Sequence, residues 1–171
     1  MYSKAKIGRH PIHPMFVAFP ITFYLTTFVA FLVYQTASND IFWFKLAYFC
    51  NFAGVVTALV AAIPGFIDWA FGIPRDTLAK KDGMIHMTLN LITLGIFATN
   101  AIMISGQWET GITGVGMSVV LTACGCITLM FAGFYGWKMV GQHKVGVLMT
   151  AEQERIQDRY ENEEEPPVVF H

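Results

Sequence analysis

Four long apolar runs constrain what this chain can fold into more than any other feature of its sequence. They extend from Met15 to about Thr36, from Ile41 to Ile63 or beyond, from Met84 to about Ser105, and from Ile112 to about Trp137. Each run can cross a hydrocarbon core of about 30 Å as a helix that rises about 1.5 Å per residue. With 54% hydrophobic and 13% charged residues, the chain is too apolar for an ordinary soluble domain of 171 residues.

The charges between these runs predict how the chain crosses the membrane. The first nine residues carry three basic side chains and no acid, and the loop from Ile73 to Gly83 carries three more. The short links at 37–40 and 107–109 carry neither Lys nor Arg. Because basic loops stay in the cytoplasm, we predict an all-α integral membrane protein. It is a four-helix up-down-up-down bundle whose N- and C-termini are both cytoplasmic.

The chain after the last run differs in composition and predicts a second region. We divide the chain into a four-span transmembrane domain, residues 1–148, and an acidic cytoplasmic tail, residues 149–171. In the tail, a short surface helix is predicted after Thr150, which can cap it. A solvated tail is the simplest expectation, and a docking strip for a protein partner is the alternative. The net charge of −1 gives no basic field for binding nucleic acid.

The polar residues that stand out lie at the ends of the apolar runs. They are His10, His13, Asp68, His86 and His143. Counting membrane crossings places all of them on the cytoplasmic face of the bundle. Ionisable groups at membrane depth are energetically costly, so their presence indicates a functional site. The segment from Pro64 to Trp69, which contains the acid, is predicted to break or cap the second helix.

Two of these histidines, His13 and His86, are the preferred axial ligands of a haem b held between the helices. Both begin predicted spans, with His86 in the first turn of the third, so both can point into the bundle. Neutral imidazole is a common axial ligand of haem iron. Small residues recur every four positions along the second run, at Gly54, Ala58 and Ala62. They would let a flat ring or another helix approach closely.

Other residues at the same end are candidates for binding the cofactor. Asp68 could orient one imidazole through its distal nitrogen, and His10 and His143 are further candidates. Cationic side chains at the membrane interface would pair with the haem propionates. They are Arg9, Arg75, Lys80, Lys81 and Lys144. The function predicted from this set is a membrane redox subunit that exchanges electrons with a protein partner.

Three other functions remain open at this point. A structural or accessory subunit of a larger membrane complex would need the histidines only as interfacial polar groups. Several His with an Asp would also suit a non-haem metal such as zinc, copper or iron. A small transporter has less support, because Asn90 and Asn100 are more simply groups that hydrogen bond between helices. The sequence has no nucleophile elbow, so an electron-transfer or accessory role is favoured over a stand-alone enzyme.

Four segments, taken in order, resemble one known family. They are His10 to Pro14 before a Phe-Pro-Ile run, Pro64 to Trp69, His86 with Asn90, and Gly136-Trp137 followed by His143 to Val147. Over about residues 8–148 the chain is similar to the bacterial predicted membrane proteins catalogued as domain of unknown function 2231. Where that family has glycine-rich residues and a tyrosine before the last histidine, this chain has Lys-Met-Val-Gly-Gln at 138–142.

The resemblance implies a cellular environment for the protein but no particular reaction. Some relatives look like fusions or neighbours of Rieske-type or cytochrome modules, which implies a redox environment. The bacterial source of the family further implies that the membrane is the inner, or cytoplasmic, membrane. The resemblance is therefore consistent with a haem protein that contacts the lipid bilayer and a protein partner.

Overall fold

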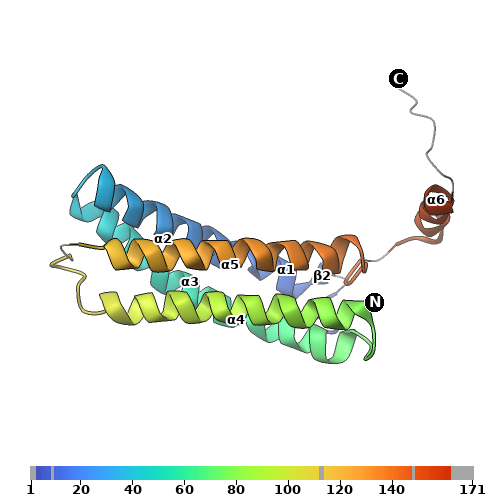
Figure 1. Ribbon diagram of the computed structural model, residues 1–171. Coiled ribbons are helices and arrows are strands. Elements are labelled where there is room, and N and C mark those ends of the chain that lie inside the picture. Colours follow the sequence, from blue (N-terminus) through green and yellow to red (C-terminus); the bar gives the residue numbers. More distant parts are fainter. Residues whose placement is uncertain (1–2, 9, 112–113, 148, 163–171) are drawn as a thin grey trace, which may run out of the picture.

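The computed structural model describes residues 3–8, 10–111, 114–147 and 149–162. Helices dominate these residues (Figure 1). In chain order the elements are β1 (Lys6–Ile7), β2 (His10–Pro11), α1 (Ile12–Phe16), α2 (Ala18–Thr36), α3 (Ile41–Ile67), the π-helical turn η1 (Asp68–Gly72), α4 (Leu78–Ile104), α5 (Gly116–Gly141) and α6 (Ala151–Asn162). β1 and β2 form a short antiparallel pair in which Ile7 lies opposite His10.

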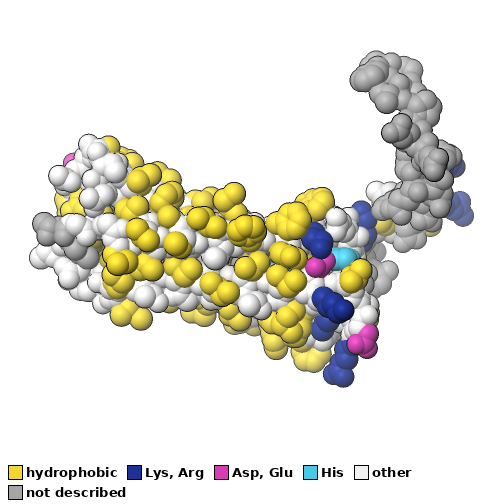
Figure 2. Space-filling view, in the orientation of Figure 1, with side chains coloured by type: hydrophobic (Ala, Val, Ile, Leu, Met, Phe, Trp, Pro, Cys, Tyr) yellow, Lys and Arg dark blue, Asp and Glu magenta, His cyan; other side chains and the backbone are white. Residues whose placement is uncertain are grey.

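Four helical segments are long and apolar enough to cross a membrane. They are Ile12–Thr36, Ile41–Gly72, Leu78–Ile104 and Gly116–Gly141. The predicted all-α fold with four membrane-spanning helices is therefore confirmed. Figure 2 shows the matching surface, on which hydrophobic side chains cover the long middle of the bundle and basic side chains gather near one end. Such a surface suits a lipid bilayer, with the charged end at the interface.

The four spans form two helical hairpins that pack against each other (Figure 1). The N-terminal hairpin comprises α1, α2 and α3, and the C-terminal hairpin comprises α4 and α5. In each hairpin the early turns of the first helix contact the late turns of the second, since His13 bonds Ala61 and His86 bonds Ala132. The helices within each hairpin are therefore antiparallel, as their short links require. Their direction across a bilayer stays a prediction.

Pro20 interrupts the first span near the end that carries His13. A proline inside a helix lacks the N–H that would bond the carbonyl four residues earlier, here that of Phe16. The helix accordingly breaks at Val17, with α1 ending before this residue and α2 beginning after it. The interruption is local, because the Val17 N–H still bonds the His13 carbonyl and the Ile21 N–H bonds the Val17 carbonyl, so His13 lies in the first turns of one continuous span.

The second helix ends within the segment from Pro64 to Trp69, as predicted. α3 passes through Pro64 and ends at Ile67, with Asp68 as its C-cap, and the chain then winds on as η1. Lys80 holds the end of this turn, because its Nζ donates hydrogen bonds to the backbone carbonyls of Trp69, Ala70 and Ile73. These carbonyls have no helical partner beyond the end of the turn, and the ammonium group supplies one.

The third helix begins earlier than predicted. Thr77 caps α4 by accepting a hydrogen bond from the backbone N–H of Lys80 at 3.1 Å. The helix therefore starts at Leu78 rather than at Met84, and His86 lies in its third turn instead of its first. The charged residues before Met84 indicated a loop, but a membrane helix can extend past the hydrocarbon region into the interface.

The fourth helix begins at Gly116, four residues later than predicted. Gly111 and Gly114 have positive φ angles of 64° and 87°, a conformation that favours glycine and that a right-handed helix does not contain. The predicted start, Ile112, lies outside the described residues. At its other end α5 continues to Gly141, past the predicted end.

Large buried side chains fill the half of the bundle that lies away from His13. Phe31, Phe44, Ile104 and Val115 are at most 2% exposed and come from all four spans or their caps. Phe31 and Phe44 meet edge to face, with ring centroids 6.1 Å apart. Lipid tails are as apolar as these side chains, so close packing rather than a hydrophobic effect holds the helices together here.

A layer of buried polar side chains crosses the middle of the bundle. Asn100 donates from Nδ2 to Oδ1 of Asn51 at 3.1 Å, and Asn51 donates to the carbonyl of Phe97 at 3.0 Å. The prediction that Asn100 bonds between helices is confirmed. The same prediction for Asn90 is wrong, because its Nδ2 donates to the carbonyl of His86 in the same helix at 2.8 Å.

The helix predicted in the tail is present as α6, beyond the end of α5 (Figure 1). Thr150 caps it reciprocally with Gln153. The Thr150 N–H donates to the Gln153 side chain at 2.9 Å, and the Gln153 N–H donates to the Thr150 hydroxyl at 3.2 Å. The predicted cap is therefore confirmed.

Candidate functional site

A cavity of about 390 Å³ lies between the two hairpins, at the end of the bundle where α1 and α4 begin. All four spans contribute to its walls, which are mostly apolar. Inside the bundle its polar side chains are those of His13, Tyr24, His86, Asn90 and Thr93. An apolar space with a few convergent polar groups is the usual form of a small-molecule site.

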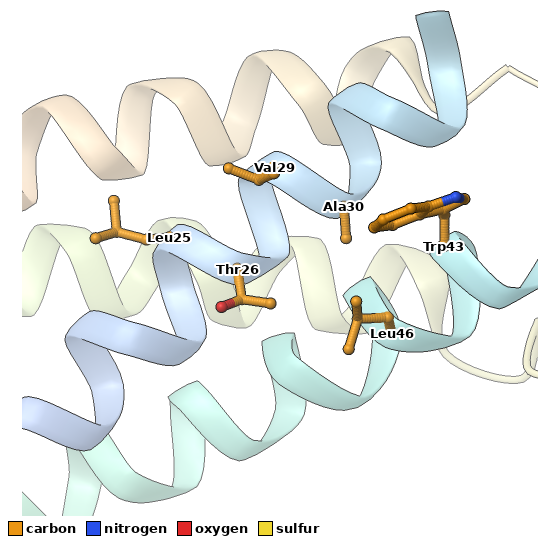
Figure 3. Close-up of a pocket in the computed structure, with 6 residues that line it drawn as sticks. All are labelled: Leu25, Thr26, Val29, Ala30, Trp43 and Leu46. Atoms are coloured by element: carbon orange, nitrogen blue, oxygen red, sulfur yellow. The ribbon is translucent and has the colours of Figure 1, made fainter. Parts of the chain in front are cut away.

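A second, shallower hollow lies between α2 and α3 of the N-terminal hairpin. Figure 3 shows its lining, and the volume is about 230 Å³. The lining residues are Leu25, Thr26, Val29, Ala30, Trp43 and Leu46. None of these six side chains ionises, so the cavity between the hairpins is the better candidate for a functional site.

His13 is held in the cavity by the neighbouring helix of its own hairpin. Its Nδ1 lies 2.9 Å from the carbonyl oxygen of Ala61. One turn further along α3, Gly65 leaves room for the ring. A Cβ at Gly65 would lie 2.8 Å from both Nδ1 and Cε1 of the imidazole, which is closer than real Cβ contacts allow. The ring therefore rests directly on the glycine backbone.

His86 is held in the same way by the C-terminal hairpin. Its Nδ1 lies 2.8 Å from the carbonyl oxygen of Ala132, and a Cβ at Gly136, one turn further on, would lie 3.0 Å from its Cε1. Asn90 adds a contact on α4, with its Nδ2 3.3 Å from His86 Nε2. Both imidazoles are thus seated against a glycine and bonded to the carbonyl four residues before it.

The two imidazoles approach each other from opposite hairpins. Their ring centroids are 6.2 Å apart, and the ring planes are inclined at 85°. A carbonyl oxygen can only accept a hydrogen bond, so Nδ1 of each ring carries the proton when the ring is neutral. That tautomer leaves the lone pair of Nε2 as the metal-binding or hydrogen-bond-accepting atom. The cavity therefore brings together the two histidines preferred from the sequence, and their role as ligands stays a prediction.

Asp68 has a different partner from the predicted one. Its Oδ2 accepts a hydrogen bond from the Ser3 hydroxyl at 2.8 Å, and its Oδ1 accepts from the backbone N–H groups of Lys4 and Ala5 at 2.6 and 2.8 Å. Among the described residues, its hydrogen bonds go to this N-terminal segment and not to an imidazole. The acid instead ties the N-terminal segment to η1, and Ser3 is only 7% exposed as a result.

His143 and His10 lie at the same end of the bundle but do not line the cavity. His143 Nε2 is 2.7 Å from Oδ2 of Asp82, and Lys138 Nζ is 2.8 Å from the same oxygen. His143 is thus part of an ion cluster at the rim of the bundle. His10 lies in β2 and is exposed. The sequence placed these histidines at the correct end, but only His13 and His86 share one space.

The cations proposed for the propionates are distributed around this end. Arg75 and Lys81 are exposed and do not line the cavity. Lys80 is already bonded to the carbonyls at the end of η1, and its Nζ lies 4.1 Å from the centre of the Trp69 ring. Arg9 lies outside the described residues.

Two chain segments cover the end of the cavity that faces the aqueous interface. Ser3 and Pro11 line it from the N-terminal segment, and Val145 and Gly146 line it from the segment after α5. These segments come close together, since a Cβ at Gly146 would lie 3.5 Å from the Pro11 ring. Apolar lining residues that are also exposed on the bundle surface, such as Leu91, extend the walls toward the lipid.

The groups that position both rings were not predicted from the sequence. These are the carbonyls of Ala61 and Ala132 and the glycines Gly65 and Gly136. A signal was present, because the same alanine-to-glycine step of four residues occurs near the end of both helices. This step could not be linked to the histidines from the sequence, because the sequence does not show which helices pack together.

The non-haem metal hypothesis lacks a ligand set in the part of the chain that the structure describes. There, no group of three or more His, Cys, Asp or Glu side chains converges on one point. Zinc in a structural site takes four such ligands, and in a catalytic site three. Two facing imidazoles alone do not meet that requirement.

Comparison with known proteins identifies the family. The family model described as "Predicted membrane protein (DUF2231)" matches residues 9–149 of the chain. No curated protein and no solved structure matched significantly. The match covers both hairpins and includes every residue that seats the two imidazoles. The chain belongs to the DUF2231 family of predicted membrane proteins.

Proposed function

We propose that this protein is an integral membrane electron-transfer subunit that holds a haem b between His13 and His86. The observation that carries the proposal is the placement of two imidazoles on opposite walls of one cavity, with ring centroids 6.2 Å apart. If haem binds there, His13 and His86 would be the residues that hold its iron, since neutral imidazole is a common ligand of haem iron.

The shape of the cavity supports a flat ligand. Its walls are the facing sides of the two hairpins, and small residues line both of them. They are Ala58, Ala61, Ala62 and Gly65 on α3, and Gly133 and Gly136 on α5. These small residues leave room beside longer lining side chains such as Tyr24 and Met139, and a largely apolar lining suits the hydrocarbon edges of a planar macrocycle.

The donor set also favours haem over a bare metal ion. A porphyrin supplies four nitrogen ligands itself, so the protein needs to add only two, and two imidazoles are what the cavity offers. Each ring donates its Nδ1–H to a backbone carbonyl, which is the usual support of a metal-ligating histidine. This bond fixes the ring orientation and makes Nε2 more basic.

When bound there, haem iron would take up and release one electron at a time. The chain's own residues would set the conditions for that exchange. The carbonyls of Ala61 and Ala132 orient the rings, and the segments around Ser3 and Gly146 keep water from the cavity. Burial and hydrogen bonding of this kind tune a reduction potential. Arg75 and Lys81, at the same end, stay the predicted partners of the propionates.

The electron partner in this proposal is a protein that docks at the charged end of the bundle. Basic side chains cluster there (Figure 2), and basic segments of membrane proteins stay on the cytoplasmic side. We therefore place this end, with both termini, on the cytoplasmic face of a bacterial inner membrane. A charged, solvent-accessible rim next to a buried cofactor suits electrostatic docking of a redox partner.

A structural or accessory subunit is the second candidate, and one observation favours it. Each imidazole already has a hydrogen-bond partner on the neighbouring helix. Two such bonds hold the open ends of the hairpins together without any cofactor. In that case the histidines would contribute to stability and the protein would carry no chromophore.

A reduced-minus-oxidised visible spectrum of the detergent-purified protein, expressed with a full supply of haem, tests the proposal. We expect Soret and α bands in the wild type and their loss in His13→Ala and in His86→Ala. His10→Ala and His143→Ala are matched controls, since they remove histidines from the same end but outside the cavity. Absence of a Soret band from the wild type would overturn the haem assignment and favour the structural candidate.

A further inference from the structure

We infer that the site consists of two copies of one half-site, one in each hairpin, and that Gly65 and Gly136 are the positioning residues of the two copies. The part of this inference that concerns haem rests on the proposed function. The repeat itself stands on the geometry of the chain and needs no cofactor.

The first observation is a shared spacing. Five residues of the N-terminal hairpin have counterparts in the C-terminal hairpin. The pairs are His13 with His86, Tyr24 with Phe97, Gly54 with Gly125, Ala61 with Ala132, and Gly65 with Gly136. Eleven residues separate the histidine from the aromatic residue in both hairpins, and eleven separate the two glycines in both.

The second observation is that the contacts repeat along with the spacing. The histidine seats described above are one repeated contact, and the aromatic residues make another. A Cβ at Gly54 would lie 2.7 Å from the Tyr24 ring, and a Cβ at Gly125 would lie 2.5 Å from the Phe97 ring. The two rings then stack face to face, with centroids 3.8 Å apart and planes at 13°. Each hairpin therefore seats an imidazole and an aromatic ring on glycines.

The third observation extends the repeat through the polar layer. Thr27 and Asn100 each lie fourteen residues after the histidine of their hairpin, and both are fully buried. On the second helix of each hairpin, Asn51 and Thr122 each precede the first of the two glycines by three residues, and both are fully buried. Two parallel copies of one unit are related by an axis along the membrane normal. The cavity lies between the two copies and is lined by both.

The repeat explains why both seats are glycine. In a helix interior, alanine is more favourable than glycine, so glycine needs a reason at Gly65 and Gly136. The reason is the ring, because a methyl group at either position would push the imidazole away from the carbonyl it bonds. Each glycine thus acts through its histidine, whose Nδ1 it leaves free to reach the backbone carbonyl.

Thermal unfolding of the cofactor-free protein in detergent tests this inference. The decisive quantity is whether a glycine-to-alanine substitution lowers or raises the Tm when its histidine is present or absent. We expect Gly65→Ala to lower the Tm when His13 is present and to leave it unchanged or raise it in a His13→Ala background. In a His86→Ala background, Gly65→Ala should still lower the Tm. Gly136→Ala should show the reverse dependence, being harmful with His86 and harmless without it. Gly95→Ala is the matched control, because a Cβ there meets no atom within 4 Å.

An equal loss of Tm in both backgrounds would overturn the seat assignment, and a silent Gly136→Ala would overturn the equivalence of the two copies. If Gly65→Ala does not fold, the double variant His13→Ala/Gly65→Ala decides, since recovery of a folded protein supports the seat and failure contradicts it. These outcomes hold whether or not haem binds. On the haem-loaded protein, Gly65→Ala and Gly136→Ala should each shift the Soret band or reduce haem retention several-fold, while Gly95→Ala does neither. Absence of haem from the wild type would count against the proposed function alone.

Discussion

The two ends of this four-helix bundle differ in how tightly their side chains pack. At the end away from His13, Phe31, Phe44 and Ile104 fill the space between the spans and are fully buried. At the other end, small residues on α3 and α5 contribute to the lining of a cavity of about 390 Å³. The packed end therefore supplies most of the stability of the bundle. The end near His13 can be less tightly packed and still keep its fold.

The largest expected effect comes from opening a cavity at the packed end. Replacing the fully buried Phe44 by Ala should lower the free energy of unfolding by about 3–5 kcal/mol. Unfolding in mixed micelles measures the change. Phe131, which is exposed on α5, provides a control of the same size, and Phe131→Ala should change little. Equal losses for the two variants would mean that the ends do not differ in packing.

At the site end, the largest expected effect comes from Asp68. Asp68→Ala removes the acceptor of three hydrogen bonds. A hydrogen bond to a charged group contributes about 1.5–3 kcal/mol to the free energy of unfolding. We expect a loss of about 2 kcal/mol and faster hydrogen exchange at the Lys4 and Ala5 amides. Asp68→Asn keeps one acceptor oxygen, so its stability and its exchange rates at these amides should lie between those of the wild type and those of Asp68→Ala. Unchanged exchange at both amides would show that the carboxylate does not hold the N-terminal segment.

The polar layer between the two ends should contribute less. Asn51 and Asn100 form one buried hydrogen bond between helices, and such bonds in membrane proteins average about 0.6 kcal/mol. A double-mutant cycle with Asn51→Ala and Asn100→Ala should give a coupling of this size. A coupling near zero would mean that the two amides do not bond in the membrane.

The smallest expected effect is that of Tyr24→Phe, at the floor of the cavity. The Tyr24 hydroxyl is buried and has no hydrogen-bond partner among the described residues, and Phe97 shows that a phenyl ring suits the equivalent place. Removing the hydroxyl should leave the stability of the cofactor-free protein unchanged or raise it by less than about 1 kcal/mol. A clear loss of stability would contradict this and would show that the hydroxyl has a hydrogen-bond partner inside the cavity.

The sequence predicted the parts of this molecule that depend on local pattern. Run length and loop charge gave four spans, and the position of His13 and His86 before or early in two of them gave the pair that shares the cavity. The start of α4 was missed because a cap at Thr77 competes with a charged segment that resembles a loop. The partner of Asp68 was missed because it lies more than sixty residues away in the chain.

The glycine seats were missed for a related reason. Hydropathy describes one helix at a time, whereas a seat exists only between two helices. Gly65 and Gly136 became meaningful once α3 was placed against α1 and α5 against α4. The stripe at Gly54, Ala58 and Ala62 was noticed because it repeats within one helix, and it does line the aromatic stack and the cavity.

The division of the site between two hairpins has a consequence for how the protein is made. A ribosome delivers the N-terminal hairpin to the membrane before the C-terminal hairpin has been synthesised, so for a time only one imidazole is present. A group that needs both rings can be enclosed only after the second hairpin has inserted. Under the proposed function, haem loading would therefore be a late step of biogenesis, and a chain that ends after η1 would present His13 without the imidazole from the other hairpin.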